Sequence, residues 1–343
     1  MPQLQGMGHS ETLAELRRRL MPGLVPWLLL HLLAAAALTW MTRRYALHRG
    51  LLDSPGARRS HALPTPRGGG IAIVIPVLAA GVWLALYWPA HLMAIILFCA
   101  GLLLVSGIGW LDDHRPLPAS LRFAVHLLAA SLLAAALALE ALPWWQVVLG
   151  WLLAVSLINI WNFMDGINGL ASSQAIIASA GFALLLPAPW ALLGWAVCAA
   201  CLGFLPFNFP RARIFLGDVG SGALGYLLAA LTTLSLAHAG SPFVALLPLV
   251  VFCVDAGFTL LRRVLRREAW WQPHTTHAYQ CAARRLGHSR VTIACALFSL
   301  IATFLMLTTW QGTVLSGFGI LALCCLAAAG AWVKQQAGKP PQG

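Results

Sequence analysis

Residues 92–113 read LMAIILFCAGLLLVSGIGWLDD, a run of apolar and small residues that ends in two adjacent aspartates. About 20 consecutive residues of this kind are enough for an α-helix to cross the hydrocarbon core of a bilayer. The two carboxylates would therefore lie where such a helix leaves the membrane. Apolar runs of similar length recur along the whole chain, so this stretch is typical of the fold.

The composition also indicates a membrane protein. Of the 343 residues, 60% are hydrophobic and 9% are charged, and the mean hydropathy is +0.79, whereas soluble proteins carry about 25% charged residues. We expect an all-α, polytopic helical membrane protein with about eleven transmembrane helices. They form one domain, 23–333, between an N-terminal segment, 1–22, and a tail, 334–343. The predicted spans are 23–42, 70–88, 92–111, 122–140, 144–162, 169–187, 190–208, 220–238, 242–261, 291–309 and 313–333.

The basic residues predict the orientation. The net charge of +12 could indicate a nucleic-acid partner, but the basic residues lie in short connections between spans, so we expect none. Of the 22 Lys and Arg residues, 19 fall on one side, and the positive-inside rule makes that side cytoplasmic. Arg17, Arg18 and Arg19 do not fit this pattern. Either residues 11–20 form a surface amphipathic helix, or translation begins at Met21.

Acidic residues are scarce, and most share the cytoplasmic side. Seven of the ten lie there: Asp53, Asp112, Asp113, Asp165, Asp218, Asp255 and Glu268. Carboxylates gathered at one membrane face suggest a divalent cation and a phosphate-bearing substrate. Asp255 is the exception because it lies inside the ninth span, where pairing with Arg262 is the simpler account.

The first polar motif is the loop that precedes the second span. It contains Pro-Thr-Pro-Arg-Gly-Gly-Gly at 64–70, and its prolines and glycines exclude a helix. Arg59, His61 and Arg67 could hold phosphates. The alternative is topogenic charge beside a turn.

The second motif is the pair Asp112-Asp113. Adjacent carboxylates repel each other unless a cation or a base lies near. On a helix they point about 100° apart, so one could face a ligand while the other supports it. The alternative is a solvated helix end that pairs with Arg115 or Arg122.

The third motif is NIWNFMDGINGL at 159–170. Asn159, Asn162 and Asp165 recur every three residues, so on a helix they can address one ligand. Polar residues this close to the membrane interior are costly and usually functional. The alternative is a plain helix cap followed by a turn.

The last two motifs are FLGDVGSGALG at 215–225 and PHTTHAYQ at 273–280. A glycine-rich turn that opens a helix offers free N–H groups to an anion, and Asp218 would hold a cation beside it. Small residues that merely pack helices are the alternative. His274 and His277 could contact phosphate or bind a metal, or they are ordinary loop histidines.

Taken together and in this order, the five motifs resemble those of the polyprenyl-phosphate N-acetylhexosamine-1-phosphate transferases, glycosyltransferase family 4. The matching stretches cover roughly residues 43–290. The resemblance implies a multi-pass enzyme of the bacterial inner membrane, with one catalytic domain embedded in the lipid bilayer. It would transfer a sugar 1-phosphate from a UDP-N-acetyl sugar to undecaprenyl phosphate at the cytoplasmic face and release UMP. It also implies Mg²⁺, or Mn²⁺, as the cofactor. Whether the enzyme is a monomer or a homodimer is left open.

The resemblance assigns roles to individual residues. It makes Asp218 the main metal ligand and implies catalytic roles for Asp112, Asp113, Asp165, His274 and His277. The residues that it implies for substrate binding are Asn159, Asn162, Gly166, Ile167, Asn168, Asn208 and Phe215, to which the first motif adds Arg59, His61 and Arg67.

One departure from the family bears on the substrate. Phospho-N-acetylmuramoyl-pentapeptide transferase has three consecutive histidines where this chain has His-Thr-Thr-His. This favours the branch that starts O-antigen or common antigen on UDP-GlcNAc, UDP-FucNAc or a similar sugar, with the pentapeptide transferase as the alternative. From another class, a membrane transporter or flippase would place its polar groups near the midplane of the membrane. We expect a one-step displacement in which Asp112 or Asp113 aligns the acceptor or removes its last proton. A phospho-aspartyl intermediate is the competing route.

Overall fold

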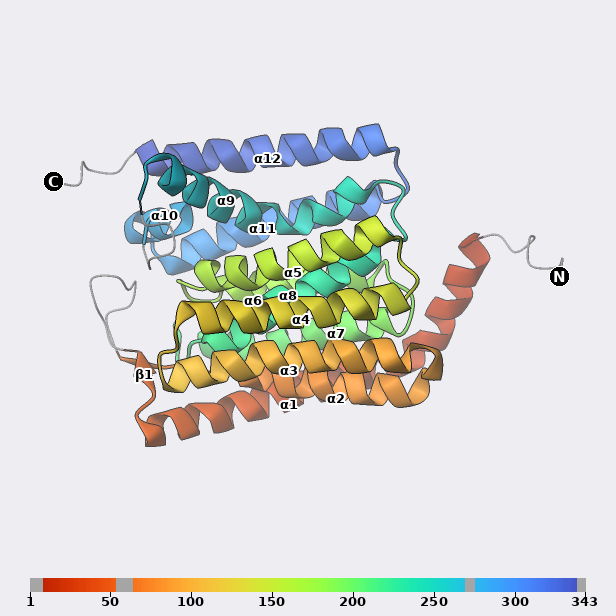
Figure 1. The fold of residues 1–343 in the computed structure, drawn as a ribbon, viewed down its shortest axis with the longest axis horizontal. Coiled ribbons are helices and arrows are strands. Elements are labelled where there is room, and N and C mark those ends of the chain that lie inside the picture. The colour runs from red at the N-terminus through yellow and green to blue at the C-terminus, as the bar shows by residue number, and fades with distance from the viewer. Residues whose placement is uncertain (1–8, 54–63, 269–274, 338–343) are drawn as a thin grey trace.

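Helices account for nearly all secondary structure in the computed structural model, which describes residues 9–53, 64–268 and 275–337 (Figure 1). In chain order the elements are α1 (His9–Arg49), β1 (Leu52–Asp53), β2 (Thr65–Pro66), α2 (Ile71–Tyr87), η1 (Pro89–His91), α3 (Leu92–His114), α4 (Ala119–Leu139), α5 (Trp144–Met164), α6 (Leu170–Ala183), α7 (Trp190–Asn208), α8 (Asp218–Leu236), η2 (Pro242–Leu249), α9 (Val250–Leu265), α10 (Ala278–Leu286), α11 (His288–Thr308) and α12 (Val314–Ala337).

The predicted polytopic helical fold is confirmed. Within the described residues, nine helices are long and apolar enough to cross a membrane, and α2 and α6 are shorter apolar helices. All eleven predicted spans coincide with these helices. The ninth differs in kind, because its first part, η2, is a 3-10 helix. Pro248 lies inside η2 and donates no backbone hydrogen bond, so the regular α-helix begins only after it, at Val250.

The central helix of the bundle is α8. Every residue from Val219 to Leu236 is buried, and α8 packs against α3, α5 and α6. A helix that is apolar on all sides must be surrounded by other helices. Its first residue, Asp218, lies at the end of the bundle that carries the polar loops, so the helix with the most packing partners leads directly to the candidate site.

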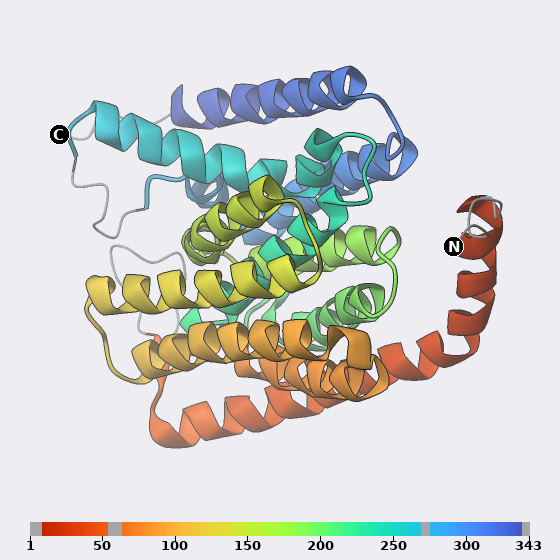
Figure 2. The ribbon, with the colours of Figure 1, turned by 45° about the vertical axis from the view of Figure 1, so that its right-hand side comes forward.

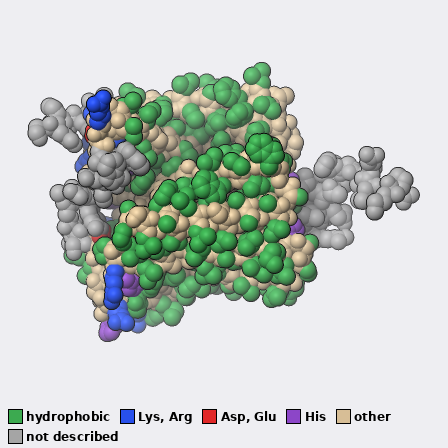
Figure 3. Space-filling view, viewed as in Figure 1, with side chains coloured by type: hydrophobic (Ala, Val, Ile, Leu, Met, Phe, Trp, Pro, Cys, Tyr) green, Lys and Arg blue, Asp and Glu red, His purple; other side chains and the backbone are tan. Residues whose placement is uncertain are grey.

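The two ends of the molecule differ in charge. Figure 3 shows hydrophobic side chains across the middle of this face, while Lys and Arg side chains gather at one end. That end carries β1, α10 and the C-terminal end of α12 (Figure 1). The protein is therefore a multi-pass membrane protein whose basic end matches the predicted cytoplasmic side.

Helix α1 begins at His9 and continues without a break past residue 22, where the N-terminal segment was expected to end. Its first turns lean away from the other helices (Figure 2). At the other terminus, α12 lies at the edge of the bundle (Figure 1), and very little of its apolar stretch is buried.

Candidate functional site

The polar motifs meet around Asp218, the first residue of α8. Asn162 Nδ2 donates a hydrogen bond to Asp218 Oδ1 at 2.9 Å, and Arg122 Nη1 donates to Oδ2 at 2.9 Å. Asn162 Nδ2 also donates to Ser221 Oγ at 3.1 Å, one turn along α8. The Asp218 carboxylate therefore joins the end of α5, the beginning of α4 and the start of α8.

The adjacent residues Asp112 and Asp113 bind different partners, as the angle between their side chains on a helix predicts. Asp112 Oδ2 accepts from the same Arg122 Nη1 at 2.9 Å, so Arg122 bridges Asp112 and Asp218. Asp113, which is 3% exposed, accepts from the backbone N–H groups of Asp218 and Val219, each at 3.2 Å. A carboxylate at the first N–H groups of a helix also has a favourable interaction with its dipole. Asp113 thus binds the start of α8 to the end of α3.

Two backbone segments run alongside each other beneath these acids. Phe215 N donates to Pro66 O at 2.8 Å, Gly69 N to Phe215 O at 2.9 Å and Gly70 N to Leu216 O at 2.7 Å. A Cβ on Gly70 would overlap Gly220 Cα, so only glycine permits this approach. The loop before α2 is therefore bonded to the loop before α8 chiefly through its backbone.

Asp165 follows the last residue of α5 and lies near enough to Asp218 and Asp113 to feel their charges. Burial raises the pKa of its carboxyl well above the usual value, and the negative charges of Asp218 and Asp113 raise it further. Arg67, half-buried in the adjoining loop, contributes a positive charge that acts on Asp113. Three carboxylates thus lie close enough to repel one another.

Most of the asparagines that were expected to contact substrate form hydrogen bonds to backbone groups of the protein. Asn208 Oδ1 accepts from Gly169 N at 2.7 Å, and Asn208 Nδ2 donates to Ile214 O at 2.9 Å. Asn168 Nδ2 donates to Pro210 O at 3.0 Å. Asn159 Nδ2 donates to Val155 O in its own helix at 2.7 Å, so of the helical pair only Asn162 contacts Asp218. These bonds hold the Asp-Gly-Ile-Asn-Gly turn against the loop that leads to α8.

Gly166 and Ile167 belong to this turn. Ile167 is buried, and Gly166 lies against Tyr279, whose hydroxyl would overlap a Cβ at position 166. Tyr279 Oη donates to Phe163 O at 2.9 Å. Burial raises the pKa of Tyr279 well above its usual value, and the charges of Asp255 and Asp165 add to this rise, so the hydroxyl keeps its proton and acts as a donor.

His277 lies next to this tyrosine and beside a further aspartate, Asp255. It is 2% exposed, and its Nδ1 lies 3.4 Å from Asp255 Oδ1. The expected contacts of Arg59, His61 and His274 fall outside the described residues.

Three contributors had no role in the sequence prediction. They are the bridge from Arg122 to Asp218, Ser221 and Tyr279. Arg122 had a signal, since it follows the aspartate pair closely in the sequence. Tyr279 had none, because its contact depends on α10, which lies in a stretch interpreted as a loop.

The donor set is compatible with a cation that a substrate helps to bind. Among the residues of 9–53, 64–268 and 275–337, no group of three or more His, Cys, Asp and Glu side chains is arranged to hold a metal ion. Mg²⁺, however, is usually bound by one or two carboxylates together with water and substrate phosphates. A carboxylate has about four lone-pair positions, so the two hydrogen bonds to Asp218 leave capacity for a cation.

Comparisons with known proteins place the matching region on this site. The family model described as glycosyl transferase family 4 matches residues 94–236, a range that includes Asp112, Asp113, Asp165 and Asp218. The chain is 28% identical over 303 residues to the probable undecaprenyl-phosphate N-acetylglucosaminyl 1-phosphate transferase of Bacillus subtilis, covering 82% of this chain and 84% of that protein.

Two further relatives show how far the likeness extends. The chain is 31% identical over 312 residues to the decaprenyl-phosphate N-acetylglucosaminephosphotransferase of Mycolicibacterium smegmatis, with 75% of each chain covered. It is 34% identical over 194 residues to the phospho-N-acetylmuramoyl-pentapeptide-transferase of a Synechococcus species, with 50% of this chain and 56% of that protein covered.

Proposed function

The chain belongs to glycosyl transferase family 4 and transfers a sugar 1-phosphate to a prenyl phosphate, and from this premise we propose that it uses a UDP-N-acetyl sugar and undecaprenyl phosphate. UDP-GlcNAc is the first candidate donor, because the relatives covered over three quarters of their length are named for N-acetylglucosamine. The relative named for the pentapeptide substrate is covered over only 56% of its length. The product would be the first lipid-linked intermediate of a surface glycan such as O-antigen, made in the bacterial inner membrane.

The observation that carries this proposal is the group of carboxylates around Asp218. Burial raises the pKa of Asp165, and the negative charges of Asp218 and Asp113 raise it further. Titratable groups with strongly perturbed pKa values cluster at functional sites. A divalent cation would relieve the repulsion between these carboxylates, because it would add positive charge between the acids and the diphosphate of the donor.

We assign the cation to Asp218, with Asp165 as the second carboxylate. Bound Mg²⁺, or Mn²⁺, would neutralise charge on the diphosphate and make UMP a better leaving group. Arg67 supplies further positive charge, and Asn162 fixes the rotamer of Asp218 by donating to its Oδ1. Arg122 holds Asp112 and Asp218 at one distance from each other.

The acceptor needs little chemical activation. A phosphate monoester has a second pKa near 6 and is largely dianionic at pH 7. Positioning therefore contributes more than base catalysis, and Asp112, the more exposed member of the pair, is the residue that we assign to aligning the acceptor. The nucleophile would attack the donor phosphorus directly, in one step.

The decisive experiment measures UMP release by the purified protein. Undecaprenyl phosphate and Mg²⁺ are supplied with UDP-GlcNAc, UDP-FucNAc or the UDP-muramoyl-pentapeptide in parallel reactions. We expect UMP with an N-acetylhexosamine donor and none with the pentapeptide donor. UMP from the pentapeptide donor alone would overturn the assignment of the sugar, and no UMP from any donor would overturn the proposed function.

The variant Asp218→Asn tests the metal assignment. It should lower UMP release by about a hundredfold or more, since cation stabilisation of the transition state is worth several kcal/mol. The control is Glu268→Gln. Glu268 pairs with Arg263 at a distance of 2.9 Å and is not one of the acids around Asp218. Full Mg²⁺-dependent activity in Asp218→Asn would remove this residue as the metal ligand.

A further inference from the structure

Asp255 in α9 is a buried carboxylate that the proposed chemistry does not use. It is 6% exposed. The expected partner, Arg262, does not contact it and instead donates to Gln336 Oε1 at 2.6 Å. Asp255 instead bonds to Ala278 and Tyr279 at the start of α10. The expected pair of Asp255 and Arg262 is therefore wrong.

Asp255 caps α10 from outside that helix. Its Oδ1 accepts from Ala278 N at 2.9 Å and its Oδ2 from Tyr279 N at 2.8 Å. The first N–H groups of a helix have no partner within the helix, and a carboxylate there also interacts favourably with the helix dipole. His277, the residue just before α10, places its ring 3.4 Å from the same carboxylate.

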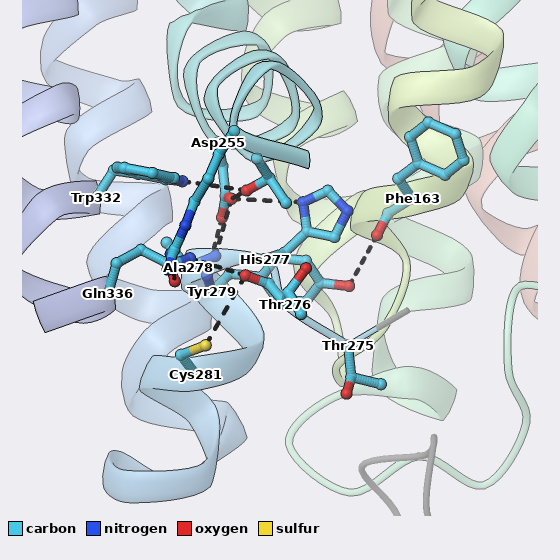
Figure 4. A network of polar contacts seen from close by, with 12 residues as sticks. Phe163, Asp255, Thr275, Thr276, His277, Ala278, Tyr279, Cys281, Trp332 and Gln336 are labelled. Carbon is cyan, nitrogen blue, oxygen red and sulfur yellow. Dashed lines mark hydrogen bonds and ion pairs between the residues drawn. The ribbon is translucent and has the colours of Figure 1, made fainter. Parts of the chain in front are cut away.

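Helix α12 also forms hydrogen bonds with α9 and with the segment before α10 (Figure 4). Trp332 Nε1 donates to Thr259 Oγ1 at 3.1 Å, and Thr259 Oγ1 donates to Asp255 Oδ1 at 3.1 Å. Gln336 Nε2 donates to Thr276 O at 2.7 Å, directly before His277. The last turns of α12 thus bond to Asp255 indirectly, through Thr259, and directly to the segment that Asp255 caps.

The same segment reaches the candidate site. Tyr279 Oη donates to Phe163 O at the end of α5, two residues before Asp165. The His277 ring lies against the Phe163 ring, with their centroids 6.2 Å apart. A displacement of the start of α10 would therefore be transmitted to the turn that carries Asp165 and Gly166.

We infer that Asp255 is a positioning residue, which together with Gln336 of α12 fixes residues 276–279 against the Asp165-Gly166 turn. The inference rests on the proposed function only in its effect on turnover. The claim that Asp255 and α12 hold α10 in place does not depend on the proposed function. It assigns to the C-terminal helix, which lies at the edge of the bundle, a part in building the site.

The test combines hydrogen exchange with kinetics on the full-length protein. Asp255→Ala should raise the exchange rate of the amides in 278–281 by about tenfold or more, since the loss of a hydrogen bond to a charged group is worth at least about 1.4 kcal/mol. It should lower kcat by a similar factor while the KM for undecaprenyl phosphate changes little. Asp255→Asn should recover part of both effects, because one side-chain oxygen still accepts. Gln336→Ala should shift them in the same direction by a smaller factor.

Glu268→Ala is the matched control, because it removes a carboxylate near the end of the same helix without touching α10, and it should leave exchange and kcat unchanged. Unchanged exchange in 278–281 for Asp255→Ala and Gln336→Ala would overturn the inference, as would loosened exchange with unchanged kcat. If Asp255→Ala does not fold, Asp255→Asn and Gln336→Ala decide the outcome by the same measurements. If the wild type releases no UMP, the proposed function fails while the exchange data still decide whether Asp255 holds α10.

Discussion

Gly166 has no room for a side chain, because the Tyr279 hydroxyl occupies the place that a Cβ would take. A Cβ there would overlap Tyr279 Oη and would lie 3.0 Å from Gln280 Nε2. Gly166→Ala should therefore displace Tyr279 and lower UMP release by about tenfold or more, the factor that corresponds to about 1.4 kcal/mol.

A second substitution separates this clash from a general loss of stability. Tyr279→Phe removes the hydroxyl, so the double variant should recover part of the activity that Gly166→Ala loses, and the coupling can be measured as a double-mutant cycle. Gly107→Ala is the control, because nothing lies within 4 Å of the added Cβ. Additive losses in the double variant would show that the hydroxyl does not limit the space at position 166.

Asp165 should cost the protein stability at neutral pH. Its folded-state pKa is raised by burial and by Asp218 and Asp113, so in the folded protein its ionisation is unfavourable. The unfolded chain ionises it freely above its ordinary pKa, and stability therefore falls as pH rises from that value to the raised one. Asp165→Asn removes this penalty and should raise the apparent Tm at pH 7.5 while it abolishes activity.

The size and the pH dependence of this effect are both measurable. Each 1 kcal/mol corresponds to about 2–4 °C for domains of roughly 150–250 residues. The gain of Asp165→Asn should shrink as pH falls toward the ordinary pKa of a carboxyl, where both proteins are neutral at this position. A gain that grows at acidic pH would show that the buried charge of Asp165 is not its cause.

Much of the residue-level site was accessible from the sequence. The sequence places the four motif aspartates on one side of the membrane, and the structure brings them together: Asp218 and Asp113 act on Asp165, and Asp112 shares Arg122 with Asp218. The division between Asp112 and Asp113 followed from helix geometry. The roles of Asn168 and Asn208 did not, because a side chain that bonds to loop backbone looks the same in sequence as one that faces a ligand.

At the scale of elements, the junction between α3 and α8 depends on Asp113. Both Asp113→Asn and Asp113→Ala remove its charge, but only the asparagine retains an oxygen that can accept from Asp218 N or Val219 N. Loss of a helix cap costs about 1 kcal/mol. Asp113→Ala should therefore have the lower apparent Tm of the two, by a few degrees, in a thermal-shift measurement. Equal values would show that these bonds do not hold the start of α8.

The spans were predictable because an apolar run of sufficient length has few alternatives in a membrane. Where the prediction was incomplete, tertiary packing or proline chemistry decided the structure. The short helix α10 was not predicted because it has only nine residues and lies within an Arg-rich stretch that was interpreted as a loop. The 3-10 segment η2 reflects prolines that a hydropathy pattern does not register.

At the scale of the whole molecule, the distribution of basic residues predicts which end faces the cytoplasm. In a background without the eight native cysteines, Gln311→Cys should react with a membrane-impermeant maleimide in intact cells, because it lies in the connection between α11 and α12. Arg115→Cys, between α3 and α4, should react only after the cells are permeabilised. The reverse pattern would invert the orientation and exclude a cytoplasmic site.

The close backbone contact between Gly70 and Gly220 has a consequence for drug resistance. Bacteria often escape an inhibitor by changing a side chain in its binding site. Where two chain segments meet at glycines whose added Cβ would overlap a neighbouring backbone atom, such a change also disrupts the enzyme. Strains resistant to an inhibitor of this enzyme should therefore carry changes at positions other than Gly70 and Gly220, or increased production of the protein.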